Sequence, residues 1–292
     1  MEQTHFNTNS VRGRLRRQAI LADGSQKTER KKMIAVLNGI LWLLRFAIGV
    51  CVFSFLNVVI YRLPQGESVV HGRSHCMGCG KTLTAGELIP CVSYLIQGKK
   101  CRGCGGKISG RYFKVELAGG LAFVCCGAFF GYGESGLLSL RGLIAFAYLG
   151  ILIIVALIDW DTKIIYNRFH IIILLLGIAA LWLFPEHPVT DRLIGAAAVS
   201  LPMLLIAIAI EGAFGGGDIK LMAVSGFLLG WRSILIAMFL GLLTGSAYAI
   251  GMMAAKKLTR KDHFAFGPFL ALGLAIALFY GDTIANWYLS LL

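Results

Sequence analysis

The stretch Gly215-Gly216-Gly217-Asp218-Ile219-Lys220 sets a carboxylate directly after three glycines, between two long apolar runs. A charged side chain at membrane depth is costly, so an acid in this setting is a candidate functional residue. The glycines let the backbone turn tightly, with no side chain to keep a substrate backbone away. The stretch therefore predicts a chain that enters the membrane on both sides of the turn, with chemistry at the turn itself.

A second carboxylate, Asp159, ends another apolar run. Two carboxylates that face one water molecule can share a proton, because like charges at close range push their two pKa values apart. The ionised acid takes a proton from the water, and the protonated acid polarises the scissile carbonyl. Asp159 and Asp218 are therefore predicted to be the catalytic pair of a membrane aspartyl protease. Supporting roles are assigned to four neighbours of the pair: Asp161, Gly215, Gly217 and Lys220.

Other interpretations of the two aspartates stay open. Each aspartate alone could cap a helix or form an ion pair, for example Asp218 with Lys220. A non-enzymatic membrane assembly or transport protein could use the two acids as an ion pathway. Motifs of other catalytic classes are absent from the sequence, which contains no HExxH, GxSxG or Walker loop. His170, His187 and His263 are expected to be isolated residues at loop ends, at the membrane interface.

The composition is that of a multi-pass membrane protein. Of the 292 residues, 57% are hydrophobic and 15% are charged, against about 25% charged in soluble domains. The net charge of +13 is interpreted as a topology signal, because Lys and Arg stay on the cytoplasmic side. A basic chain can also bind nucleic acid, but the charge lies in loops between apolar runs. Membrane lipid is the expected partner, and nucleic acid is not.

The apolar runs predict an all-α protein with about eight transmembrane helices. Starting from a cytoplasmic loop after the first helix, the alternation puts Asp159 and Asp218 on the cytoplasmic side, together with the basic residues Lys256, Lys257, Arg260 and Lys261. Eight crossings leave the basic N-terminal tail outside, and this conflict stays open. The run 219–230 is shorter than the roughly 20 residues that a full crossing needs. The expected spans are 34–61, 115–132, 141–158, 168–184, 192–210, 219–230, 233–254 and 267–290.

Four segments organise the chain. Residues 1–33 form a basic tail, expected to be flexible or to lie on the membrane surface, with a possible amphipathic helix over 11–21. Residues 34–61 form the first span, 62–114 a polar loop, and 115–292 the membrane core. Within that core, Gly226 with Gly230, and Gly241 with Gly245, have the spacing of close helix contacts.

The loop 62–114 predicts a structural zinc site. Two CxxC pairs, Cys76 with Cys79 and Cys101 with Cys104, provide four thiolates that can surround one zinc ion. A glycine follows each pair, as a tight metal-binding turn requires. A redox dithiol or a pair of disulfides is the alternative. The loop should be cytoplasmic, because nine of its residues are basic: Arg62, Arg73, Lys81, Lys99, Lys100, Arg102, Lys107, Arg111 and Lys114.

Ordered sequence blocks cover most of the chain from about Phe53 to Gly273. They are SFLNVVIYRLP (Ser54–Pro64), RSHCMGCG (Arg73–Gly80), ELIPCVSYL (Glu87–Leu95), CRGCGGKIS (Cys101–Ser109), RYFKVEL (Arg111–Leu117), IDWDTKIIYN (Ile158–Asn167), GGGDIKLM (Gly215–Met222) and FGPFLALG (Phe266–Gly273). In these blocks the chain resembles the type IV prepilin peptidases, bacterial inner-membrane aspartyl proteases of the GxGD class.

The resemblance implies that Asp159 and Asp218 cleave the basic leader of prepilins or pseudopilins after a glycine, on the cytoplasmic side of the inner membrane. It also implies N-methylation of the new amino terminus with S-adenosylmethionine. No GxGxxG-type nucleotide fingerprint is present, so the methyl donor rests on the resemblance alone and its binding residues are unassigned. Tyr166 stands where the family usually has proline before the acid or amide, here Asn167, and its presence is expected to loosen the site. The sequence carries no signal for an oligomeric state.

Overall fold

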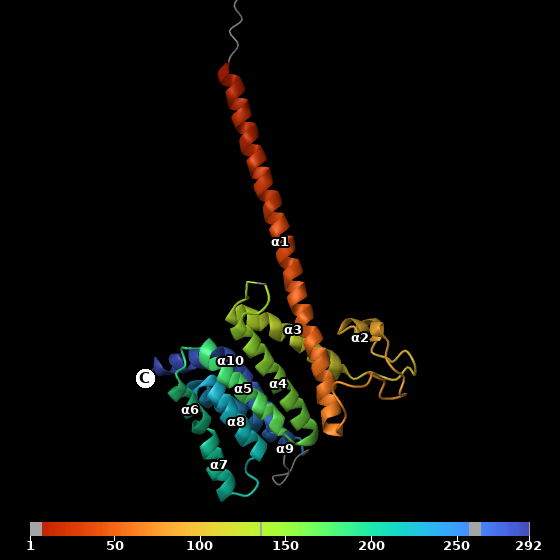
Figure 1. Ribbon diagram of the computed structural model, residues 1–292, viewed down its shortest axis with the longest axis vertical. Helices are drawn as coiled ribbons and strands as arrows, with labels where there is room; N and C mark the ends of the chain where they lie inside the picture. The colour runs from red at the N-terminus through yellow and green to blue at the C-terminus, as the bar shows by residue number, and fades with distance from the viewer. Residues whose placement is uncertain (1–7, 135, 257–263, 292) are drawn as a thin grey trace, which may run out of the picture. The chain divides into compact units, whose positions relative to one another are not determined.

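The computed structural model describes residues 8–134, 136–256 and 264–291, and over these residues the regular structure is helical, with isolated β-bridges. The all-α prediction is confirmed. The chain divides into two compact units, Met1–Arg45 and Phe46–Leu292. The α-helices are α1 (Thr8–Arg62), α2 (Val92–Ile96), α3 (Gly110–Phe130), α4 (Leu140–Thr162), α5 (Asn167–Leu183), α6 (Val189–Ala198), α7 (Ser200–Ala209), α8 (Gly216–Leu229), α9 (Trp231–Ala254) and α10 (Gly267–Leu289), as Figure 1 shows.

Six segments of the described chain are long and apolar enough to cross a membrane. The other two predicted spans exist as shorter helices, α5 with 17 residues and α8 with 14. Helix α8 ends where Gly230 takes the positive φ of +83°, a conformation that glycine adopts without strain. The fold is therefore that of a multi-pass membrane protein. The six segments are Glu29–Gln65, Gly110–Phe130, Leu140–Thr162, Val189–Ala209, Trp231–Ala254 and Gly267–Leu289.

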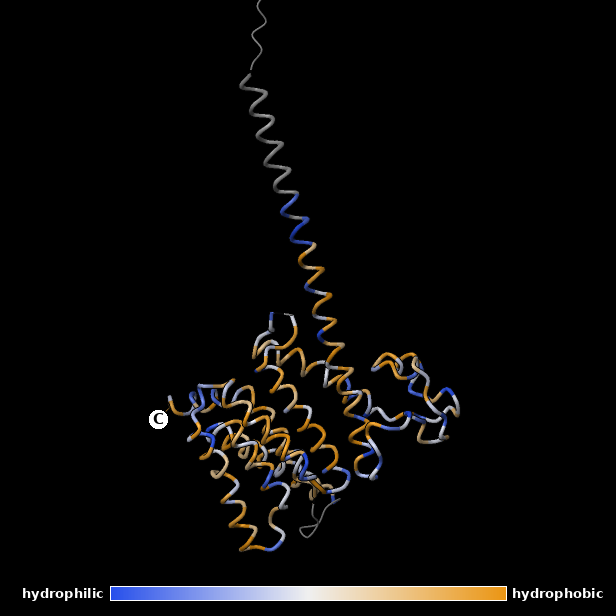
Figure 2. Tube along the Cα trace, in the orientation of Figure 1, coloured by the Kyte–Doolittle hydropathy of each residue, from blue (hydrophilic) through white to orange (hydrophobic). Residues whose placement is uncertain are grey.

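Helix α1 runs through most of the basic tail. Its first described residue is Thr8, and no break separates the polar turns before Met33 from the apolar turns after it. Figure 2 shows this change from hydrophilic to hydrophobic along the helix. The described part of the tail is thus helical. Residues 1–7 of the tail, and the basic residues Lys257, Arg260 and Lys261 of the last loop, lie outside the described residues.

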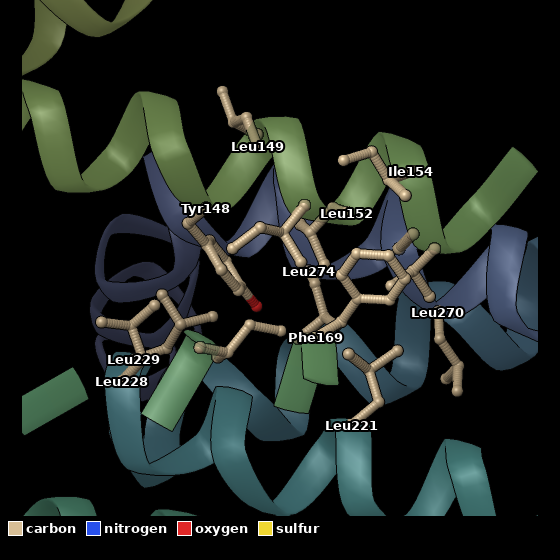
Figure 3. Packing of buried hydrophobic residues seen from close by; sticks show 14 of the residues in the cluster. Tyr148, Leu149, Leu152, Ile154, Phe169, Leu221, Leu228, Leu229, Leu270 and Leu274 are labelled. Carbon is tan, nitrogen blue, oxygen red and sulfur yellow. The ribbon is translucent and has the colours of Figure 1, made fainter. Parts of the chain in front are cut away.

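The core of the second unit is built around α4. This helix is the most buried of the six candidate spans, and side chains from α4, α5, α8 and α10 point toward one another in Figure 3. Tyr148 and Leu152 of α4, Leu221 of α8 and Leu274 of α10 are almost fully buried. Because lipid is as apolar as these side chains, the helices are held by close packing more than by water exclusion.

Two of the predicted glycine contacts lie where helices touch. A Cβ added to Gly226 of α8 would collide with the backbone of Gly195 in α6, and one added to Gly241 of α9 would press on Leu270 of α10. Glycine at these positions lets the helix backbones approach closely. At the same, C-terminal end of α8, five carbonyl oxygens surround the fully buried guanidinium of Arg192. This arginine joins the ends of α5 and α8 through the carbonyls of Ala180, Phe184, His187, Phe227 and Leu228.

Candidate active site and metal-binding module

Asp159 lies in the last turn of α4 and is 6% exposed. Its Oδ2 accepts a hydrogen bond of 2.9 Å from the backbone N–H of Gly267, the first residue of α10. A Cβ added to Gly267 would lie 2.7 Å from this Oδ2, closer than real side chains allow. Glycine at the start of α10 is therefore what allows the backbone to approach the carboxylate. Gly267 is a site residue that the sequence alone did not predict.

Asp218 lies in the first turn of α8, and Gly215 is the N-cap residue of that helix. The expected span 219–230 left the glycine stretch in a loop before the helix. In the structure, α8 begins at Gly216, so the stretch forms the start of the helix. None of the three glycines has a positive φ, so backbone conformation does not require glycine here. What matters at Gly215 and Gly217 is the absence of a side chain. A Cβ on Gly215 would lie 3.0 Å from Oδ2 of Asp218, and one on Gly217 would lie 2.9 Å from Cβ of Ile165. Gly216 has nothing within 4 Å.

The two carboxylates influence each other electrostatically. Burial first, and the neighbouring Asp159 carboxylate second, raise the pKa of Asp218 to about 7. Asp218 lies outside the six candidate spans. Its Oδ1 is buried and has no hydrogen-bond partner within the described part of the chain. Two adjacent acids, one of them with an unpaired buried oxygen, can hold a single proton between them at neutral pH.

Lys220 does not pair with Asp218 in the described structure. Its Nζ donates a hydrogen bond of 3.1 Å to Oδ1 of Asn167, the first residue of α5. The alternative in which Asp218 is only the ion-pair partner of Lys220 is therefore not the arrangement found. Lys220 instead joins the start of α8 to the start of α5, behind the acid.

His170 of α5 is a second contact to the glycine stretch that the sequence analysis missed. The side chain is buried at 5% exposure, and its Nε2 lies 3.1 Å from the carbonyl oxygen of Gly217. An N–H at Nε2 would donate to that carbonyl, which precedes Asp218 directly. The expectation that His170 is an isolated residue at the membrane interface is therefore wrong. His170 is a buried side chain that contacts the glycine stretch.

Tyr166 has the backbone angle that proline would impose. Its φ is −74° at the N-cap of α5, within the range of about −65 ± 15° that a proline ring fixes. The Arg168 guanidinium lies 5.7 Å from the centroid of the Tyr166 ring, and the ring of Phe169 packs edge-on against it at 6.5 Å. These contacts hold the turn in a proline-like conformation, which argues against the expected loosening.

Asp161, which the sequence placed near the pair, faces away into an ion pair. Its Oδ2 accepts a hydrogen bond of 2.6 Å from Arg111, whose guanidinium also donates to the carbonyl of Leu157. Arg111 belongs to the first turn of α3. Both side chains are partly exposed, so the pair adds little stability. It does connect the end of the loop 62–114 to the end of α4, two residues from Asp159.

The four cysteines of the loop converge as predicted. Their Sγ atoms all lie within 4.8 Å of one another, and those of Cys76 and Cys104 are 4.0 Å apart. Four thiolates around one zinc ion at 2.3 Å would be about 3.8 Å apart. The cluster can therefore hold a metal ion with small adjustments. The cysteines are free thiols in the described chain, so the geometry does not favour the alternative of two disulfides.

The turns that aim the thiols have the predicted glycine chemistry. Gly80 and Gly105 have φ values of +71° and +69°, which glycine adopts without strain. In each turn the residue two positions after the first cysteine donates its N–H to that sulfur, at 3.4 Å in the pair Gly78 and Cys76. The N–H of Gly78 is the main cause that lowers the pKa of Cys76 to about 6. A thiol with a lowered pKa is suited to metal binding, because the thiolate is the ligand.

Two family models match the chain. Residues 47–130 match the bacterial peptidase A24 N-terminal domain, and residues 146–250 match the type IV leader peptidase family. The first match contains the four cysteines, and the second contains Asp159 and Asp218. No solved structure matches the chain significantly.

Curated bacterial proteins are similar over most of their length. The "Prepilin leader peptidase/N-methyltransferase" of Bacillus subtilis is 36% identical, over 84% of this chain and 97% of that protein. The protein of the same name from Aeromonas salmonicida is 32% identical over 88% and 98%. That from Pseudomonas aeruginosa is 30% identical over 83% and 91%.

Proposed function

Because this chain belongs to the type IV leader peptidase family, we propose that it is a membrane aspartyl endopeptidase that removes the basic leader of type IV prepilins or pseudopilins. The observation that carries the proposal is that two acids from helices far apart in sequence, the buried Asp159 and the partly buried Asp218, interact electrostatically. A non-enzymatic membrane assembly or transport protein is not favoured, because the relatives are named as peptidases.

In the proposed reaction the two acids have different roles. Asp159, held by the N–H of Gly267, takes a proton from the attacking water. Asp218, whose pKa near 7 keeps a proton available, donates a hydrogen bond to the scissile carbonyl. The oxygen of the water bonds to the carbonyl carbon, the C–N bond breaks, and the leaving nitrogen receives a proton. No nucleophilic side chain is needed.

Zinc is the proposed occupant of the cysteine cluster. Four sulfur ligands complete a tetrahedral site and leave no open position for substrate, so the metal would be structural. The proposed ligands are Cys76, Cys79, Cys101 and Cys104, whose thiol positions fit one ion. The metal would join the two CxxC turns of the loop to each other.

N-methylation of the new amino terminus is the second proposed activity. The printed names of the relatives include an N-methyltransferase. Bound S-adenosylmethionine would supply a methyl group, whose bonding electron pair stays on sulfur while the acceptor amine, after losing a proton, forms the new N–C bond.

The proposed location is the bacterial inner membrane, with the acids facing the cytoplasm. The loop 62–114 has nine basic and two acidic residues, which favours the cytoplasmic side. Arg111 at its end pairs with Asp161, two residues after Asp159. The basic loop and the acid pair would therefore lie on the same side.

Single substitutions test the peptidase. Purified full-length protein in detergent is incubated with a prepilin, and the product mass is read with and without S-adenosylmethionine. We expect Asp159→Asn and Asp218→Asn each to abolish cleavage while the protein still accumulates in the membrane. Glu186→Gln is the control, because Glu186 pairs with the exposed Arg141. Normal cleavage by both asparagine variants would refute the aspartyl mechanism.

A further inference from the structure

A cavity of about 400 Å³ lies between the cysteine module, the end of α1 and the start of α3. Pockets of about 300–1,000 Å³ are typical of small-molecule sites. Its lining includes Cys76, Cys101 and Cys104 on one side and side chains of α1 and α3 on the other. The peptidase mechanism uses none of this space, because both catalytic acids belong to α4 and α8.

Glu116 of α3 is the fixed anion of this cavity. Its Oε1 accepts a hydrogen bond of 2.8 Å from the Ser54 hydroxyl, and its Oε2 accepts one of 2.6 Å from the N–H of Cys91. Each oxygen keeps a second lone pair. The other acid of the lining, Glu87, is already engaged by Thr84 and Lys81. Glu116 is thus the carboxylate that is both held in place and able to face a cation.

Local strain at Cys91 supports a built site. Cys91 has φ +59° and ψ −46°, a strained conformation that non-glycine residues rarely adopt. This backbone directs its N–H to the carboxylate of Glu116. Strain of this kind persists where the surrounding structure requires it, and it clusters at ligand sites.

Aromatic rings form much of the remaining wall. Tyr94 and Phe113 stack with centroids 5.3 Å apart and an interplanar angle of 23°, and Tyr61 and Tyr112 also line the cavity. Flat apolar walls suit a planar heterocycle, and ring faces attract a cation. Together with Glu116, the lining matches a ligand that has one aromatic part and one cationic centre.

One ion pair connects the first turn of α3, part of which lines the cavity, to the end of α4 two residues after Asp159. Ser109 and Tyr112 line the cavity, and Arg111, between them in sequence, is bonded to Asp161 at the end of α4. Cleavage at Asp159 would therefore release its product next to the module that contains the cavity. The new amino terminus would then have to move only a little to reach a methyl donor held in the cavity.

We propose that this cavity binds the methyl donor S-adenosylmethionine, with the Glu116 carboxylate facing its cationic part and the Tyr94–Phe113 pair lining the adenine side. The inference rests on the proposed methyltransferase function and assigns it a site. A basic leader peptide is the less suitable occupant, because its several cations would meet a single carboxylate not engaged by Lys81, that of Glu116, whereas S-adenosylmethionine brings one sulfonium cation.

Binding without turnover tests the assignment. Equilibrium dialysis of full-length, zinc-loaded protein in detergent, without prepilin, measures the affinity for S-adenosylmethionine and for uncharged S-adenosylhomocysteine. Glu116→Gln should weaken binding of the charged donor at least tenfold and of the uncharged product no more than about threefold. Tyr94→Leu should weaken both to a similar degree. Glu186→Gln, at a remote exposed ion pair, should change neither.

The outcomes separate this proposal from the one on which it rests. If wild-type protein binds neither compound and methylates nothing, the methyltransferase function fails while the peptidase stands. If Glu116→Gln and Tyr94→Leu bind both compounds as wild type does, the cavity assignment is overturned. Competition of a basic leader peptide with S-adenosylmethionine for the same site would also overturn it. Zinc content and prepilin cleavage report whether each variant is folded, and Tyr94→Leu carries the test if Glu116→Gln does not accumulate.

Discussion

The backbone N–H of Gly267 donates a 2.9 Å hydrogen bond to Oδ2 of Asp159, a residue 108 positions earlier in the chain. This contact makes the start of α10 part of the acid site. It also means that the position of Asp159 depends on a backbone group and not only on its own helix.

Gly267→Ala should therefore impair cleavage. The added Cβ would lie 2.7 Å from Oδ2 of Asp159, so the carboxylate or the start of α10 must shift. Because misplacement of a catalytic group by about 1 Å can cost about 100-fold in rate, we expect kcat to fall at least tenfold. Gly251→Ala is the control, because a Cβ there meets nothing within 4 Å. Equal kcat values for the two variants, measured with a prepilin, would contradict the role of Gly267.

The glycine stretch offers a matched pair of adjacent substitutions. Gly217→Ala would place a Cβ 2.9 Å from Cβ of Ile165, whereas Gly216→Ala has nothing within 4 Å. We expect Gly217→Ala to lower kcat at least tenfold and Gly216→Ala to lower it less than threefold. Kinetic assays on equal amounts of membrane protein decide this. A larger loss in Gly216→Ala would mean that substrate, and not internal packing, requires the glycines.

Cleavage should decline above neutral pH. Burial and the Asp159 carboxylate raise the pKa of Asp218 to about 7, and the mechanism needs this acid in its protonated form. The protonated fraction is high below pH 7 and falls tenfold for each pH unit well above it. At low pH the rate should fall again when Asp159 becomes protonated. Profiles of kcat/KM from pH 4 to 9 measure this bell shape. A rate that stays constant from pH 6 to 9 would show that Asp218 is not the required acid.

The cysteine module should contain about one zinc ion per chain. Replacing Cys101, which is 6% exposed, by serine should reduce the zinc content to near zero and make the remaining thiols of the module titratable. Cys51→Ser is the control, because Cys51 belongs to α1 and is not part of the cluster. Elemental analysis and thiol titration of purified protein provide the readout. Wild-type protein without zinc and with four reactive module thiols would refute the metal site.

Several features could be predicted from the sequence because they depend on local chemistry. The length of each apolar run indicates how far a helix can extend, so six of the eight predicted spans appear as full-length segments. The spacing of each CxxC pair and the glycine after it specify a turn whose geometry involves only a few neighbouring residues. Gly80 and Gly105 have the positive φ values that such turns use.

The acid site is different, because its parts meet only in the folded chain. Asp159 and Asp218 are recognisable as acids beside apolar runs, but the sequence contains no sign that Gly267 donates to one of them. The sequence predicts an isolated residue at His170, whereas its Nε2 lies 3.1 Å from the Gly217 carbonyl oxygen. From the sequence, Asp161 is a supporting neighbour of the pair, yet Arg111 engages it from another helix.

The sequence alone thus determined which residues can do chemistry and which segments are apolar enough to enter a membrane. The tertiary structure decided which acid stands beside which backbone amide, and which carboxylate is already paired. It also decided that the end of α1, the cysteine module and the start of α3 enclose a cavity. The physical reason is the difference in sequence separation between the residues that interact. Helix formation and knuckle turns depend on neighbours a few residues apart, whereas the hydrogen bonds that assemble the acid site join residues 47 to 108 positions apart.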